Sequence, residues 1–80
     1  MHYVYILQST IKPNARYIGF STNLKDRLSY HNSGSSPHTS KYKPWILLNY
    51  FAFSNKNKAY KFEKYLKSAS GRAFSKKHFL

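Results

Sequence analysis

Hydrophobic positions follow two different periods along the chain, and these periods predict its secondary structure. Residues 3–8 and 16–21 are rich in aromatic and β-branched side chains, and residues 9–14 between them contain the turn sequence Lys-Pro-Asn. This pattern is typical of a β-hairpin. Residues 45–53 are almost continuously apolar, which predicts a third strand at the centre of a small sheet.

A short amphipathic pattern follows the predicted hairpin. Asn23, with Asp26 three residues later, resembles an N-cap and its acidic partner, so a helix is expected over residues 24–32. Leu24 and Leu28 stand one turn apart in this helix and should face the core. The helix should end near the Ser-Gly pair that follows it.

The rest of the chain predicts one long loop, a further helix and a basic tail. Residues 33–44 are rich in Ser, Gly, Pro and Lys and contain no aliphatic residue, which indicates a single exposed loop. Residues 56–68 should form a helix, because apolar residues recur there at helical spacing: Ala59, Phe62, Leu66 and Ala69. Gly71 should break this helix, and residues 72–80 can add one or two helical turns. The predicted order is β-β-α-β-α with a small terminal helix as an option, an α/β sandwich.

Composition indicates a small basic domain with an aromatic core. The 80 residues carry 14 Lys and Arg against 2 Asp and Glu, a formal net charge of +12, and 19% of them are aromatic. Aromatic side chains each bury a large area, so residues 1–80 can form one compact domain. The charge favours a polyanionic partner, with nucleic acid ahead of an anionic membrane. A basic surface that is merely solvated is the alternative.

The sequence also argues against several classes of protein. No cysteine is present, which removes disulfide frameworks, Cys-ligated zinc and thiol nucleophiles. The N-terminal residues lack the cationic segment and long apolar run of an export leader, and the apolar runs are too short to cross a bilayer. A soluble cytoplasmic protein is expected.

Carboxylates are scarce, which limits the reaction mechanisms available to the chain. Only Asp26 and Glu63 are present, so sites with two metals or with paired catalytic carboxylates are disfavoured. One carboxylate can still hold one hard cation when water and substrate phosphate complete the coordination shell. Glu63 is the better candidate, because Asp26 belongs to the first turn of a helix. The alternative for Glu63 is an ordinary i,i+4 ion pair with Lys67.

Candidate proton-transfer and phosphate-binding residues stand on the hairpin and the first helix. Arg27 and His31 are four residues apart, so they lie one turn apart beside the leucine stripe. An arginine can clamp a phosphate and an imidazole can relay a proton, although a solvated helix face is the alternative. Tyr5 and Tyr17 stand on the two hairpin strands, where the turn could bring them together. Such tyrosines are mostly packing residues, yet they can transfer protons when cations favour the phenolate.

Five features in sequence order resemble the GIY-YIG nuclease superfamily. They are Tyr3-Val4-Tyr5, Tyr17-Ile18-Gly19 about a dozen residues later, Arg27 with His31 on a helix, His31-Asn32-Ser33-Gly34, and a single Glu63 on a later helix. The resemblance covers nearly the whole chain and looks closest to the small stand-alone branch similar to the N-terminal nuclease domain of the excision-repair protein UvrC. It implies a β-β-α-β-α(-α) sandwich with a small three-stranded central sheet flanked by helices. Gly19 is interpreted as structural, permitting close backbone approach between strand and helix.

The resemblance implies a role for each of five residues. Tyr5 would be the general base or part of the proton path from water, and Tyr17 would orient water or substrate. Arg27 would contact the scissile phosphate and stabilise its developing charge. His31 would assist proton transfer. Glu63 would hold one Mg²⁺ or Mn²⁺ ion, and the implied reaction is hydrolysis of a DNA phosphodiester bond.

Two hypotheses of function follow from these observations. The first is a metal-dependent DNA endonuclease, and the second is a noncatalytic nucleic-acid-binding module with the same fold. Glu63 favours the enzyme, because a pure binder has no evident use for it amid so much positive charge. RNA is not excluded as a partner, a protein partner could supply target specificity, and the oligomeric state is open. The candidate nucleic-acid-binding residues are Lys41, Lys43, Lys56, Lys58, Lys61, Lys64, Lys67, Arg72, Lys76 and Lys77.

Overall fold

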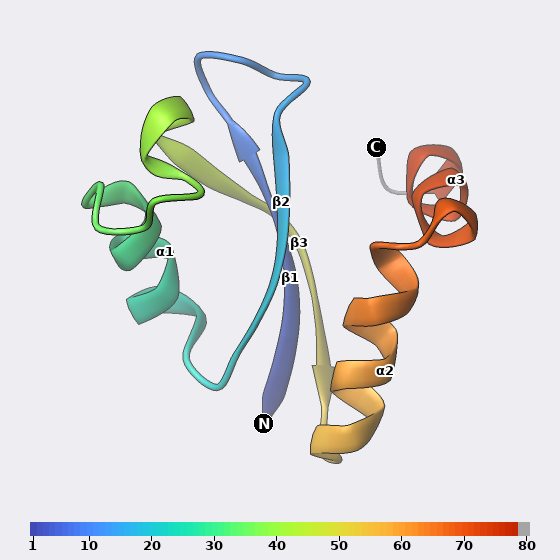
Figure 1. Cartoon of the computed structure of the whole chain (residues 1–80). Helices are drawn as coiled ribbons and strands as arrows, with labels where there is room; N and C mark the ends of the chain where they lie inside the picture. Colours follow the sequence, from blue (N-terminus) through green and yellow to red (C-terminus); the bar gives the residue numbers. More distant parts are fainter. Residues whose placement is uncertain (79–80) are drawn as a thin grey trace.

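The computed structural model describes residues 1–78, which form a three-stranded antiparallel sheet with helices on both faces (Figure 1). The strands are β1 (His2–Ser9), β2 (Arg16–Ser21) and β3 (Trp45–Phe53), in the order β2-β1-β3. Helix α1 (Leu24–Asn32) covers one face, and α2 (Lys56–Leu66) and α3 (Ala69–His78) lie on the other. The α/β sandwich expected from the sequence is confirmed.

The centre of the sheet is β1, so the prediction that residues 45–53 form the central strand is wrong. β1 pairs with β2 on one side and with β3 on the other. Four consecutive residues of β1, from Val4 to Leu7, are buried, whereas β3 leaves Ile46, Leu47 and Tyr50 exposed. A strand needs burial on both faces to be central, and an apolar run alone does not show that both faces are covered.

The pairing of β1 with β3 contains an irregularity that the sequence did not indicate. Ile6 lies opposite Asn49 and Leu7 lies opposite Leu47, so Leu48 has no partner in the register. Such a bulge re-aims the side chains on either side of it. Leu48 packs against the core on the α2 face.

Two cores, one on each face, hold the layers together. On the α2 face, Val4 and Ile6 of the sheet pack with Ala59 and Leu66 of α2. On the α1 face, the core residues are Tyr5, Leu7 and Trp45, against which Leu24 and Leu28 of α1 pack. The alternation of side chains along β1 thus assigns Tyr5 to the α1 face and its neighbours to the other.

Helix α1 begins and ends where the sequence predicts. The Asn23 side chain accepts a hydrogen bond from the Asp26 backbone N–H at 3.1 Å and donates one to the Asp26 carboxylate at 3.0 Å. This pair satisfies one of the free N–H groups of the first turn. The cap fixes where α1 starts and therefore which of its residues face the sheet.

The C-terminal helices differ from the prediction. α2 ends at Leu66, and Gly71 does not break a helix but lies buried inside α3, while Ala69 is exposed at the start of α3. A Cβ atom at Gly71 would overlap the Tyr65 carbonyl oxygen and come within 2.7 Å of the Leu66 Cα atom. Glycine at this position therefore allows α3 to pack closely against the end of α2. The last two residues of the predicted tail, 79 and 80, lie outside the described residues.

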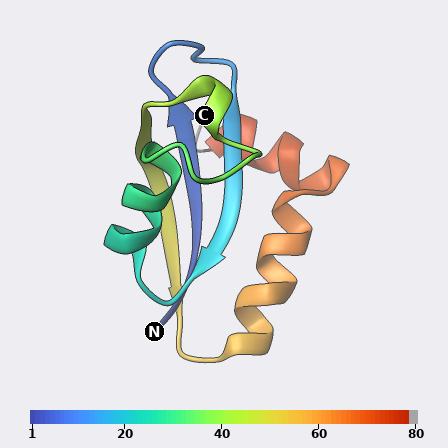
Figure 2. The ribbon, with the colours of Figure 1, turned by 60° about the vertical axis from the view of Figure 1, so that its left-hand side comes forward.

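The connection between α1 and β3 is not simply an exposed loop. It crosses the end of the strands away from the N-terminus (Figure 2) and contains a short 3₁₀ helix, η1 (Ser40–Tyr42). Ser36 and Thr39 are buried in it. Polar groups can be buried when they are hydrogen-bonded, and here the indole N–H of Trp45 donates to the Thr39 carbonyl at 2.8 Å.

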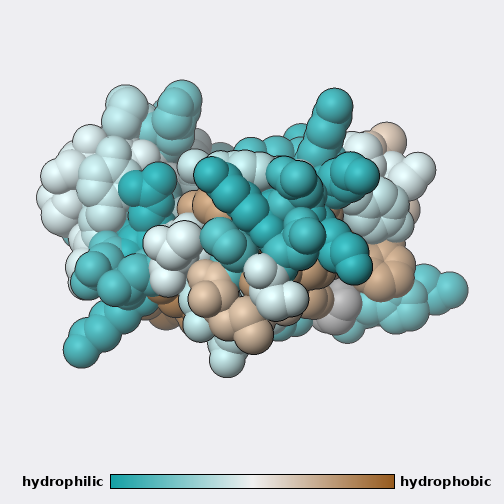
Figure 3. Space-filling view, turned by 90° about the horizontal axis from the view of Figure 1, so that it is seen from below, coloured by the Kyte–Doolittle hydropathy of each residue, from teal (hydrophilic) through white to brown (hydrophobic). Residues whose placement is uncertain are grey.

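The face at the N-terminal end of β1 is mainly hydrophilic. Seen from the N-terminal end of β1, hydrophilic side chains project between smaller hydrophobic patches (Figure 3). Among residues 1–78, no helix is long and apolar enough to span a membrane.

Candidate active site

Four of the five residues singled out by the sequence lie together on the α1 face. Tyr5 comes from β1, Tyr17 from β2, and Arg27 and His31 from α1. The Tyr5 and Tyr17 ring centroids are 6.3 Å apart, and the Tyr17 and His31 centroids are 4.7 Å apart. The Tyr5 hydroxyl lies 2.9 Å from His31 Nε2. The hairpin and the first helix thus bring the two tyrosines and the histidine into direct contact.

Gly19 makes room for Tyr5, which corrects its interpretation as a point of backbone approach between strand and helix. Tyr5 and Gly19 are opposite each other in the β1–β2 ladder. A Cβ atom at Gly19 would fall on the Tyr5 hydroxyl and ring. The missing side chain lets the tyrosine ring lie across β2 and reach α1.

His31 is held from both sides, so the solvated helix face considered from the sequence is wrong for this residue. Its side chain is only 1% exposed. Nε2 faces the Tyr5 hydroxyl, and Nδ1 lies 2.9 Å from Thr39 Oγ1. In the neutral ring one nitrogen donates and the other accepts. If Nδ1–H donates to Thr39, then Nε2 is free to accept the proton of Tyr5.

Thr39 is the residue that the sequence analysis missed. It lies in the connection before η1, eight residues after His31, and it is 1% exposed. No helical or strand period links a residue in an irregular segment to one on a helix, so spacing could not reveal the contact. The one available signal was a threonine in a segment otherwise rich in serine and lysine.

Burial sets the protonation states of the two central groups. It raises the pKa of Tyr5 to about 12, an effect to which Tyr17 adds and which the positive charge of Arg27 opposes. Burial, together with the charge of Arg27, lowers the pKa of His31 below its usual 6.5. At neutral pH, Tyr5 therefore keeps its proton and His31 is an unprotonated acceptor.

Arg27 supplies positive charge at the open side of this cluster. It is exposed, and its guanidinium carbon lies 4.9 Å from the Tyr30 ring centroid. Its charge acts on both Tyr5 and His31. An exposed, stacked guanidinium beside a buried proton acceptor can bind an anion through its planar fork.

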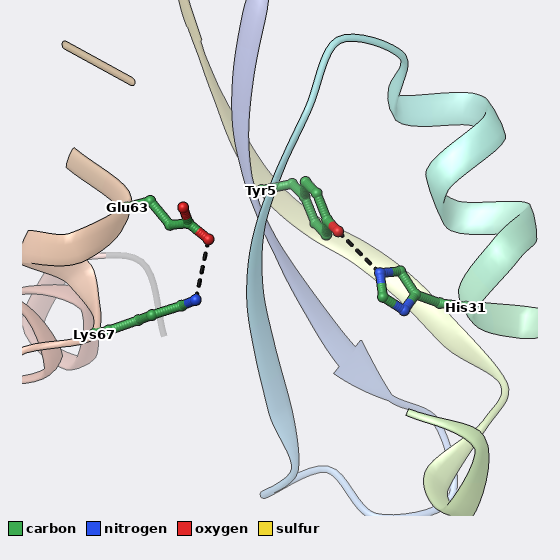
Figure 4. A network of polar contacts seen from close by, with 4 residues as sticks. All are labelled: Tyr5, His31, Glu63 and Lys67. Atoms are coloured by element: carbon green, nitrogen blue, oxygen red, sulfur yellow. Dashed lines mark hydrogen bonds and ion pairs between the residues drawn. The ribbon is translucent and has the colours of Figure 1, made fainter. Parts of the chain in front are cut away.

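Glu63, the fifth residue, comes from α2 and is separate from the α1 cluster. Its carboxylate accepts a 3.0 Å ion pair from Lys67, as the i,i+4 alternative anticipated. Figure 4 shows the Glu63–Lys67 pair and the Tyr5–His31 pair on the two sides of β2. The carboxylate is near enough for its charge to raise the pKa of Tyr5 slightly further.

The residues that could hold a metal ion amount to one carboxylate. Within residues 1–78, no three His, Cys, Asp or Glu side chains come together as a metal site. Mg²⁺ is often held by one or two carboxylates with water and substrate phosphate as the other ligands. Glu63 fits a single hard cation of that kind, in competition with the Lys67 ammonium group.

The candidate nucleic-acid-binding residues fall into two groups. Lys41 lies in η1 and Lys43 directly after it, on the α1 side of the sheet. The others lie on α2, at its C-cap or on α3, on the opposite side: Lys56, Lys58, Lys61, Lys64, Lys67, Arg72, Lys76 and Lys77. Both groups border the same sheet, whose free edge at β2 lies between them.

The chain is similar to known proteins of one family. Residues 1–77 match the family described as the GIY-YIG catalytic domain. The chain is 36% identical over 70 residues to the UPF0213 protein SH2523 of Staphylococcus haemolyticus, covering 86% of this chain and 83% of that protein. It is 37% identical over 65 residues to the structure-specific endonuclease subunit SLX1 homolog of Giardia intestinalis, covering 76% of this chain and 18% of that protein.

A solved structure shows the same fold. The solution NMR structure of the UPF0213 protein BH0048 from Bacillus halodurans superposes with a TM-score of 0.56 and 32% identity, covering 94% of this chain and 79% of that one. Together with the family match over residues 1–77, this similarity shows that the chain belongs to the GIY-YIG catalytic-domain family.

Proposed function

We propose that this protein is a DNA endonuclease that hydrolyses a phosphodiester bond with the help of one Mg²⁺ or Mn²⁺ ion. The observation that carries the proposal is the hydrogen-bonded chain from Tyr5 through His31 to Thr39, beside Tyr17 and Arg27. A module that only binds nucleic acid needs positive charge, but it has no need of a buried proton relay.

The relay can remove a proton from water without a free phenolate. As water attacks the phosphorus atom, Tyr5 takes the proton from water and passes its own proton to His31 Nε2. His31 becomes an imidazolium whose Nδ1–H continues to donate to Thr39. The attacking oxygen forms its bond to phosphorus while the bond to the leaving oxygen breaks. A base suits this step when its lowered pKa keeps it unprotonated at the working pH, so that it can accept a proton.

Arg27 and Glu63 would act on the phosphate rather than on the proton. The Arg27 guanidinium would bind the nonbridging oxygens and stabilise the charge that develops on them. When bound at Glu63, the cation would polarise the phosphate and stabilise the leaving oxygen. Lys67 would release the carboxylate in favour of the cation, and its exposed ammonium group would remain available to a neighbouring phosphate.

The charge and the relatives support the proposed substrate class. A net charge of +12 favours a nucleic acid, with DNA as the substrate and RNA as the alternative to test. We place the protein in the small stand-alone branch similar to the UvrC nuclease domain, as one domain acting in the cytoplasm. A partner protein would supply target specificity, because no base-reading motif is present in the sequence.

The test is cleavage of labelled duplex, branched and single-stranded DNA and of RNA in Mg²⁺ or Mn²⁺. The wild type should cut only with metal, and Glu63→Gln and Arg27→Ala should each lose at least a hundredfold in rate, on the scale of removing one transition-state contact. The chain offers matched controls: Asp26→Asn neutralises the other carboxylate, and Lys25→Ala removes a neighbouring cation of α1. Both controls should retain activity.

The second hypothesis is the outcome that would replace this one. The ion pair that occupies the Glu63 carboxylate favours a noncatalytic module. If no substrate is cut while salt-sensitive binding persists, the protein is a nucleic-acid-binding module of this fold. Equal activity in Glu63→Gln and the wild type would also reject the proposed mechanism.

A further inference from the structure

A cavity beside the edge strand β2 adjoins the candidate active site, but most of its lining has no role in the chemistry proposed above. Its volume is about 680 Å³, within the range of pockets that take small organic ligands. Its walls include Ile6, Ile18 and Leu66 from the sheet and α2, so part of the lining is apolar. Tyr17 lines it as well. Since the Tyr17 ring also contacts His31, the cavity and the candidate active site share a wall.

Positive charge surrounds this apolar lining. Arg16 comes from β2, Lys67 from the end of α2, and Arg72 from α3. His38 reaches the same cavity from the connection before η1. Among residues 1–78, the cavity lining contains no Asp or Glu side chain. Segments far apart in the sequence thus present cationic groups to one space, which suits a phosphate ester.

A buried hydroxyl without a partner points to a ligand. Ser75 on α3 is 2% exposed, lines the cavity, and its Oγ atom makes no hydrogen bond. Burying a hydroxyl without a partner costs stability. Alanine at this position would avoid the cost, so a ligand oxygen that completes the hydrogen bond accounts for the serine.

We infer that this cavity binds one nucleotide of an unpaired strand, with its phosphate on Arg16, Arg72 and Ser75 and its sugar or base on the apolar lining. This inference rests on the proposed function, and it names the class of DNA that the site takes. A base stacked within a duplex cannot enter a side pocket, whereas an unpaired one can. The substrate would therefore carry an unpaired nucleotide next to the scissile bond.

The ligand is tested without turnover, by titrating thymidine 5′-monophosphate, thymidine and inorganic phosphate into the metal-free chain and following backbone amide NMR signals. The nucleotide should shift the signals of Ile18, Arg72 and Ser75 and bind more tightly than either fragment. Arg72→Gln and Ser75→Ala should each weaken binding by about tenfold, the loss of one charge-assisted or buried hydrogen bond. Lys25→Gln, which removes a charge on α1, should leave the affinity unchanged.

A stability readout separates ligand binding from misfolding. Ser75→Ala should unfold at the same or a higher temperature than the wild type while it binds the nucleotide more weakly. The inference is wrong if the nucleotide shifts none of the cavity signals, if inorganic phosphate binds as tightly as the nucleotide, or if Lys25→Gln weakens binding as much as Arg72→Gln. Because no metal or cleavage is involved, failure of the nuclease assay leaves this result intact.

The preference for unpaired DNA has its own measurement. Affinity for a duplex with a single-stranded flap should fall in Ser75→Ala by about tenfold, while affinity for a blunt duplex should not change. An equal loss on both substrates would mean that the cavity contacts only the phosphate backbone, and it would overturn the assignment to an unpaired nucleotide.

Discussion

At the scale of single residues, the chemistry of the site depends on which nitrogen of His31 carries its proton. Tyr5 and Thr39 lie against the two nitrogens from opposite sides, and the proposed relay uses the tautomer in which Nδ1–H donates to Thr39 and Nε2 accepts from Tyr5. Burial keeps the ring neutral by lowering its pKa. Thr39 is therefore a positioning residue, and its effect should appear through His31.

Thr39→Val should slow cleavage on the order of 10- to 100-fold, part of the 10²–10⁴ that general acid–base catalysis supplies. The valine cannot accept from Nδ1–H, so the ring loses its fixed tautomer. Imidazole ¹⁵N shifts should then report a mixture of tautomers, which a purely structural role would not produce. Thr10→Val, at an exposed threonine, is the matched control and should keep both rate and tautomer; unchanged ¹⁵N shifts in Thr39→Val would contradict the assignment.

The lowered pKa of His31 also predicts how stability depends on pH. The unfolded chain binds a proton near the ordinary value of 6.5, whereas the folded chain resists protonation until lower pH. The stabilisation that results from this difference in proton binding is fully present above pH 6.5, and it is lost as the pH falls through the folded-state pKa of His31. The melting temperature should therefore decrease as the pH falls below about 6.5. His31→Gln should flatten the dependence; parallel curves for the variant and the wild type would refute it.

At the scale of elements, α2 and its junction with α3 position Glu63 and Lys67. The ion pair between them spans one turn of α2 and its ammonium group is half exposed. Such pairs add little to stability. In the proposed mechanism Lys67 instead controls whether the carboxylate is available to a cation, and Lys67 also lines the cavity at β2.

Lys67→Gln should therefore bind Mn²⁺ more tightly than the wild type, because the carboxylate loses its competing partner and a repelling charge. We expect a severalfold gain in Mn²⁺ affinity, which corresponds to about 1 kcal/mol for a partly exposed pair. The affinity is obtained by measuring free Mn²⁺ with EPR. Glu63→Gln should abolish specific binding, and Lys64→Gln, which removes the charge of the residue next to Glu63 but not its ion-pair partner, should match the wild type. If Lys67→Gln and Lys64→Gln bind Mn²⁺ equally tightly, Lys67 does not compete with the cation for the Glu63 carboxylate.

The α2–α3 junction depends on the missing side chain of Gly71. Gly71→Ala would force the added methyl group against the Tyr65 carbonyl oxygen, so α3 must move away from α2. Overpacking of this kind costs about 1–3 kcal/mol of unfolding free energy, which urea denaturation would measure. Ser70→Ala, at the exposed neighbouring position, should cost nothing. A Gly71→Ala variant as stable as the wild type would mean that α3 packs differently.

At the scale of the whole molecule, positive charge on both sides of the sheet should dominate the affinity for nucleic acid. If about six cations contact phosphates, log K should fall with log[salt] at a slope of about −5, or roughly 10³ in affinity between 50 and 200 mM. Fluorescence anisotropy with labelled DNA measures the slope. Lys76→Gln should reduce the slope by about one unit and Lys25→Gln should not; a flat response would show that the charge is merely solvated.

The sequence by itself determined the order of the elements, the bounds of β2 and α1, and the family to which the chain belongs. Hydrophobic period and helix capping are local, so residues 16–21 and 24–32 carried enough information. The order of the candidate tyrosine, arginine, histidine and glutamate residues along the chain was also visible in the sequence. Local signals thus gave the candidate residues without their surroundings.

Only the tertiary structure decided what surrounds those residues. Four features depend on contacts between segments far apart in the chain. They are the central position of β1, the place of Gly71 inside a helix, the burial of His31 against Thr39, and the position of Ser75 at a cationic cavity. Burial, and with it the direction of a pKa shift, comes from the packing of all elements at once. No local hydrophobic period encodes burial. The sequence therefore predicted which residue types carry the chemistry, and the fold determined how these residues are arranged.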